Sequence, residues 1–237
     1  MKKLLFLFLL CSYAAHAQEL FVYTEPASNM PAKSVGIRVS NMLMNEKNAA
    51  GNEYHIIPEI MWGVNKNLMV HVNAFVSNQE NNLKAEGGSV YAKYRFLSND
   101  ALHSHFRMAA YGKVSFNNSE INQDEIDLYG HNSGYQAGIV TTQLLHKTAL
   151  SANLSYIRAD DNGSKNKFPS AQSKDAVNYS FSFGKLMLPK EYTSYQQTNL
   201  NIMVELLGQT LGANGKSYMD IAPSLQLIIN SQARIDI

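Results

Sequence analysis

Alternation between apolar and polar residues with a period of two recurs along nearly the whole chain, in stretches of about nine to eleven residues. In residues 33–45, for example, Val35, Ile37 and Val39 alternate with Arg38 and Ser40. Successive side chains of a strand point to opposite faces, so each stretch has one apolar and one polar face. A tilted strand of this length crosses the apolar layer of a bilayer. The pattern therefore predicts an antiparallel transmembrane β-barrel.

The stretches also predict how many strands there are. We expect strands at residues 33–45, 54–64, 68–76, 89–96, 105–116, 135–144, 148–156, 177–187, 199–208 and 218–229, and the start of an eleventh at Ala233. Bacterial single-chain barrels close with an even number of strands. We therefore expect about 10–12 strands, twelve in a full-length parent whose closing strand is missing here, with ten as the alternative. Pro58 and Pro223 lie inside expected strands, where each removes a hydrogen-bond donor, so they predict bulges or strand ends.

The connections between the expected strands alternate in length. Counted from a periplasmic start, the even connections include the short turns 65–67, 145–147 and 230–232, and the odd ones include the long polar loops 77–88, 117–134 and 158–176. Short periplasmic turns and long external loops are typical of outer-membrane barrels. Two even connections, 98–104 and 188–197, are longer than this rule expects.

Aromatic residues on the apolar faces gather near the ends of the expected strands. They form two sets: Tyr54, Phe116, Tyr135, Tyr156 and Tyr179 at outer ends, and Trp62, Phe96 and Phe106 at inner ends. Such rings favour the two membrane interfaces, so they predict an aromatic girdle in contact with outer-membrane lipid. The alternative is a soluble periplasmic β-sandwich or barrel, such as a β-sandwich binding protein, whose apolar faces would pack on each other.

The first seventeen residues have the organisation of a secretory signal peptide. Lys2 and Lys3 precede an apolar run, and Ala15-His16-Ala17 forms a small-x-small cleavage site. We expect residues 1–17 to be removed, 18–32 to form a periplasmic N-terminal segment and 33–237 to form the C-terminally incomplete barrel. Lipoprotein processing at Cys11 is an alternative, although Leu10 precedes it where a small residue is preferred.

Removal of the signal peptide also limits the chemistry. The chain's only cysteine would be lost, which excludes disulfides, thiol catalysis and cysteine-ligated metals. The net charge would fall from +1 to −1 with the loss of two lysines, and nothing in that balance indicates a nucleic-acid partner.

Three segments resemble proteins of a known kind. Residues 58–63 (PEIMWG), 142–147 (TQLLHK) and 231–234 (SQAR) are similar to segments of outer-membrane barrels from Bacteroidetes-type bacteria, which are loosely similar to the outer-membrane family named for the meta-pathway of phenol degradation. The resemblance implies a barrel in the outer membrane of a Gram-negative cell, with the barrel-assembly machinery as a partner during biogenesis. It also implies passive passage of small solutes.

One pair of residues suggests an enzyme. His131 and Ser133 are two apart, so a strand would place a base and a nucleophile on one face. The pair resembles the His-x-Ser of outer-membrane phospholipase A, but the Asn expected about a dozen residues later is replaced by Leu145. The alternative is a polar loop end entering a strand, which we favour. The sequence therefore predicts no enzyme, no cofactor and no metal, with a lipid hydrolase as the alternative.

The polar faces carry charged side chains that would line the barrel's interior. They are Arg38, His55, Glu59, His71, Lys93, Arg95, Arg107, Lys113 and Glu205, with Arg234 and Asp236 on the last strand. Buried charges must be paired or hydrated. Four of the basic residues, Lys93, Arg95, Arg107 and Lys113, would form one side of the interior, which we call the basic wall. One interpretation is a plugged, structural barrel in which Glu59 pairs with Arg38 and His71, and in which Glu59 and Glu205 neutralise the basic wall. The other is a small channel with excess positive charge that favours anions.

Overall fold

A single antiparallel sheet makes up most of the protein. The computed structural model describes residues 20–45, 52–78, 83–121, 123–191, 194 and 196–237, and the expected signal peptide lies outside them. The strands are β1 (Val35–Asn45), β2 (Asn52–Gly63), β3 (Leu68–Ser77), β4 (Lys84–Ala101), β5 (Ser104–Asn117), β6 (Ser133–Leu145), β7 (Thr148–Asp160), β8 (Asp175–Leu188), β9 (Asn199–Leu211), β10 (Ser217–Ile229) and β11 (Ala233–Asp236). In these parts of the chain, no helix has the length and apolarity needed to cross a membrane.

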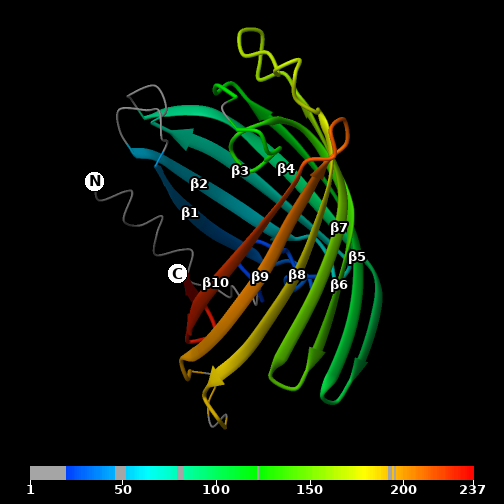
Figure 1. The fold of residues 1–237 in the computed structure, drawn as a ribbon. Coiled ribbons are helices and arrows are strands. Elements are labelled where there is room, and N and C mark those ends of the chain that lie inside the picture. Colours follow the sequence, from blue (N-terminus) through cyan, green and yellow to red (C-terminus); the bar gives the residue numbers. More distant parts are fainter. Residues whose placement is uncertain (1–19, 46–51, 79–82, 122, 192–193, 195) are drawn as a thin grey trace, which may run out of the picture.

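Every strand pairs with its neighbour in the sequence, and the sheet curls around an enclosed space (Figure 1). Within the described residues β1 pairs only with β2, and β11 pairs only with β10, so the curled sheet does not close. The prediction of an all-β antiparallel barrel architecture is confirmed. We call the concave side of the sheet the inner face and the space that it encloses the lumen.

The two faces of the sheet differ because the alternation is carried through every strand. Large apolar side chains stand on the outer face, where Ile37 and Ile221 are each 68% exposed and Leu154 is 61% exposed. Polar side chains stand on the inner face, where Ser151, Ser182 and Gln226 are buried. Some apolar side chains, such as Phe75 and Met203, are buried as well, but the large apolar side chains on the outer face remain exposed, unlike those of a water-soluble protein, which mostly gather inside.

Strand boundaries and prolines show where the pairing departs from the expected pattern. β4 and β5 continue to Ala101 and Ser104, so the connection that looked long is a two-residue turn. The ladder between β2 and β3 skips Ile57 and Pro58 without a shift in register, so Pro58 interrupts the pairing but marks neither the bulge nor the strand end that the sequence predicted. Pro223 lies inside β10 opposite Val204, and its other side has no partner because β11 accompanies only the last part of β10.

The lumen is filled from both ends by the chain itself. Residues 20–34, which we call the N-terminal segment, lie against the inner face instead of outside the sheet (dark blue in Figure 1). At the other end, the loop between β5 and β6 turns inward, and its Ile126 and Leu128 pack with Ile157 and Leu211 in an apolar cluster. The expected periplasmic segment is therefore part of the lumen's contents.

Candidate functional site

The structure places the residues predicted to line the interior on the inner face. His55, Glu59, His71, Lys93 and Glu205 are buried, whereas Arg38, Arg95, Arg107 and Lys113 are half-buried. Of the aromatic residues expected in the girdle, Trp62, Phe96, Phe116, Tyr135 and Tyr156 are exposed on the outer face, and Tyr54, Phe106 and Tyr179 are half-buried.

Glu59 is the centre of a charged network on β1, β2 and β3. Its carboxylate accepts a hydrogen bond of 2.6 Å from Arg38 Nε and lies 2.7 Å from His71 Nδ1. Arg38 is directly opposite Glu59 in the register, and His71 belongs to the neighbouring strand. Adjacent strands bring these side chains together, as their positions in the sequence predicted. The network compensates the buried carboxylate, which would otherwise be strongly unfavourable.

The basic wall is neutralised by groups other than those expected. Lys93, which is fully buried, lies 3.0 Å from the Glu25 carboxylate and donates hydrogen bonds to the carbonyls of Pro26 and Ser28 at 2.5 and 2.9 Å. Arg107 pairs with Asp100 at 3.0 Å. The expectation that Glu59 and Glu205 would neutralise this wall is corrected, because Glu25 and Asp100 occupy that role.

Arg95 and Lys113, the other two basic residues of this wall, have different surroundings. Arg95 lies near the turn between β2 and β3, where its Nη2 donates a hydrogen bond of 2.6 Å to the carbonyl of Lys66. The ammonium of Lys113 lies 4.6 Å from the centroid of the Tyr129 ring, which comes from the loop between β5 and β6. The four basic side chains therefore have separate partners and do not form one continuous positive surface.

Glu205 binds the main chain of the N-terminal segment. Its Oε1 accepts hydrogen bonds from the backbone N–H groups of Val22 and Tyr23, both at 2.9 Å, and its Oε2 accepts one from Thr24 at 2.7 Å. Ser182 on β8 donates a further bond of 3.1 Å to Oε2. Three successive amides and a hydroxyl thus satisfy a carboxylate that is completely buried.

Sequence reasoning missed the N-terminal segment as part of the site. The sequence contained one signal of burial, because Phe21, Ala27 and Met30 are apolar residues in a stretch that lacks strand alternation. All three are buried in the structure, each in a separate small cluster against the inner face. The segment's main-chain contacts could not be predicted from the sequence, because nearly every residue type can make them.

His131 and Ser133, the candidate catalytic pair, belong to the hydrogen-bond network that holds the loop between β5 and β6. Ser133 Oγ accepts a hydrogen bond of 2.8 Å from the backbone N–H of Asn117 and donates one of 3.1 Å to the Asn117 carbonyl. The ring of His131 lies 4.8 Å from that of His55, and its Nε2 lies 3.9 Å from Asp127. The serine hydroxyl is therefore bonded to the backbone, and the histidine faces the lumen.

The loop between β7 and β8 is organised around one carboxylate. Asp161 accepts hydrogen bonds of 3.0 Å from the backbone N–H of Phe168 and from Lys167, and Lys174 lies 3.4 Å away. The Phe168 amide and then the two ammonium groups hold the pKa of Asp161 at about 2, below its usual value of 3.8. The arrangement of this loop therefore depends on an ionised carboxylate.

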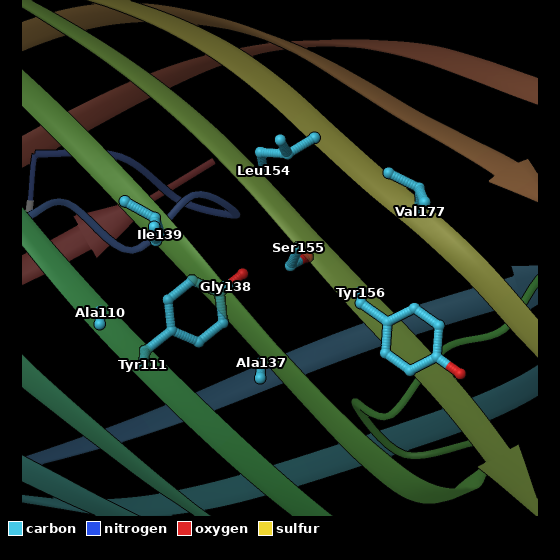
Figure 2. Close-up of a pocket in the computed structure, with 9 residues that line it drawn as sticks. All are labelled: Ala110, Tyr111, Ala137, Gly138, Ile139, Leu154, Ser155, Tyr156 and Val177. Atoms are coloured by element: carbon cyan, nitrogen blue, oxygen red, sulfur yellow. The ribbon is translucent and has the colours of Figure 1, made fainter.

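The outer face carries a shallow hollow of about 530 Å³ between β5 and β8. Figure 2 shows the side chains around it, among them Ile139, Leu154 and Tyr156. The hollow surrounds Gly138, where an added Cβ would lie 2.5 Å from that of Ser155 and 2.9 Å from the Tyr111 ring. Its lining is almost wholly apolar and continuous with the outer face, so it offers apolar contact and no arrangement of reactive groups.

Over the described ranges, the structure contains no group of three or more His, Cys, Asp or Glu side chains that could hold a metal ion. The rings of His55 and His71 have different neighbours, since His55 contacts His131 and His71 contacts Tyr91. No protein-family model matches this chain, and no curated protein was found to be similar to it.

Proposed function

We propose that this chain is an integral β-barrel of the bacterial outer membrane, which forms part of the wall and is closed to solutes at rest by its own N-terminal segment. The observation that carries the proposal is the apolar outer face, whose large side chains are exposed on strands from β1 to β11. A surface of this extent is unfavourable in water, and it matches the apolar layer of a bilayer.

The inner face supports a closed barrel over an open channel. Lys93, Arg107 and Glu205 are occupied by groups of the protein, which leaves less charge to attract an ion. The N-terminal segment and the inward-turned loop lie in the path that a solute would take. Passage of small solutes would therefore require the segment to move.

Membrane fractionation of the full-length protein tests the location. We expect the protein to sediment with outer membranes, to resist extraction by high salt and to dissolve only in detergent, because its apolar outer face would be in contact with lipid instead of water. The control is a soluble periplasmic protein of the same cells. Recovery in the periplasmic fraction without detergent would overturn the proposal in favour of a soluble periplasmic barrel.

Planar-bilayer recordings test the closed state. We expect the wild-type protein to give no steady conductance, because the lumen is filled from both ends. A steady conductance that prefers anions would contradict the closed barrel and support the selective channel. An assay of calcium-stimulated phospholipid hydrolysis on the same vesicles covers the enzyme alternative, which would be supported by activity that Ser133→Ala abolishes.

A further inference from the structure

The N-terminal segment is held to the inner face mainly through its main-chain atoms. The side chains that hold it are Glu205 on β9, Lys93 on β4, Thr142 on β6 and Arg234 on β11, which we call the lumen clamp. Most of the bonds that they make go to main-chain atoms of the segment. Hydrogen bonds to main-chain atoms allow a protein to hold a peptide segment with little regard to its sequence.

The main-chain bonds follow the segment almost residue by residue. Glu205 accepts the N–H groups of residues 22, 23 and 24, and Thr142 Oγ1 accepts that of Ala27 at 2.8 Å. Arg234 Nη2 donates to the carbonyl of Phe21 at 2.8 Å, and Lys93 donates to the carbonyls of residues 26 and 28. The Glu205 carboxylate and the Thr142 hydroxyl thus accept hydrogen bonds from the segment's N–H groups, and the cationic side chains of Arg234 and Lys93 donate hydrogen bonds to its carbonyls.

A few side chains of the segment add selectivity. Phe21 is 1% exposed and packs with Ala149 and Met203. Glu25 pairs with Lys93, and Ala27 is fully buried against Ala109 and Val140. The side chain of Tyr23, by contrast, is 60% exposed. The site therefore requires an aromatic residue, an acidic residue four positions later and a small residue two positions after that.

We infer that the lumen clamp is a peptide-binding site, occupied by the chain's own residues 21–28, which takes a peptide of this pattern in trans when the N-terminal segment is released, with the backbone bent as it is at residues 22–24. The inference depends on the closed lumen of the proposed function, but it does not depend on insertion into a membrane. Buried Glu205 and Lys93 supply the affinity, since hydrogen bonds to ionised groups are the stronger ones.

The experiment separates the segment from the barrel after folding. A sequence-specific protease site is inserted between Ala32 and Lys33, which are both exposed, and the purified full chain is cut in detergent. The cut protein is then incubated with an excess of a fluorescent peptide of residues 20–32, and binding is followed by anisotropy. We expect saturable binding that is at least about tenfold weaker for peptides with Phe21→Ala or Glu25→Gln.

Matched controls make the result specific. A Tyr23→Ala peptide should bind within about twofold of the parent, because only its main chain is held. On the barrel, Glu205→Gln should weaken binding at least about tenfold, whereas Glu191→Gln, in the exposed turn between β8 and β9, should not. Equal binding of all peptides, or no binding of the parent peptide, would overturn the inference.

A second measurement avoids the cut. In the intact chain, Tyr23→Cys is labelled with a spin probe, and its mobility is compared with and without Glu205→Gln. We expect an immobile label that Glu205→Gln loosens and that the free peptide releases, but not a scrambled peptide. A label that stays equally immobile in every case would overturn the inference. Fractionation of the same variants reports membrane location independently, so a failure here is distinguishable from a failure of the proposed function.

Discussion

At the scale of single residues, the inner face shows how a pair that looks catalytic can serve a structural purpose. The Ser133 hydroxyl bonds to both backbone groups of Asn117, and the Ser133 N–H donates to Asn162 Oδ1 at 2.7 Å. Asn162 in turn donates to the carbonyls of Ser119 and His131. Short polar side chains commonly satisfy turning backbone in this way.

Ser133→Ala therefore tests this assignment through stability. We expect the free energy of unfolding to fall by about 1–3 kcal/mol, because a buried N–H and a carbonyl of Asn117 lose their partner. Urea unfolding in detergent, followed by the fluorescence of Trp62, measures the change. Ser164→Ala, in the exposed part of the next loop, is the control. An unchanged midpoint for Ser133→Ala would contradict the structural role.

At the scale of elements, strands and loops differ in what holds them. The strands are fixed by ladders that run the length of the sheet, whereas the loop between β7 and β8 relies on Asp161. A carboxylate whose pKa is lowered by folding stabilises the folded form at every pH above its unfolded pKa. That stabilisation is lost as the pH falls from 3.8 towards 2.

We therefore predict an acid transition in this loop. Between pH 7 and about 4 the amide proton of Phe168 should keep its chemical shift, and it should move with a midpoint near 2 as Asp161 is protonated. Nuclear magnetic resonance of the protein in micelles measures it. Asp161→Asn should remove the titration, and a midpoint near 3.8 would show that the carboxylate lacks these partners.

At the scale of the whole molecule, the lumen's contents decide whether the barrel conducts. The N-terminal segment joins β4 to β9 and β11 through Lys93, Glu205 and Arg234. These bonds cross the space that an open channel would leave free. A single substitution that weakens the binding of one end of the segment should therefore alter the conductance of the entire barrel.

Glu205→Gln is the change that should open the lumen. An amide cannot accept three backbone N–H groups as well as a carboxylate does, so the N-terminal segment should leave the inner face more often. We expect intermittent conductance in planar bilayers where the wild type is silent, and Glu191→Gln should behave as wild type. Silence of Glu205→Gln in folded, inserted protein would show that the inward-turned loop alone closes the lumen.

The sequence by itself determined the sheet and its two faces. Alternation is a local property, so the outward position of Ile37 and the inward position of Glu59 follow from their parity within a strand. The pairing of Glu59 with Arg38 and His71 also followed, because consecutive strands of an antiparallel sheet lie side by side.

Only the tertiary structure decided what fills the lumen. The bonds of Glu205 to residues 22–24 join positions more than 180 residues apart, and they use backbone N–H groups, which every residue except proline possesses. No pattern of side chains encodes such contacts. The same holds for Lys93, whose partners come from a segment without strand alternation. The alternation along each strand predicts that Glu205 and Lys93 point inward. Their partners depend on the path that the folded chain takes through the lumen.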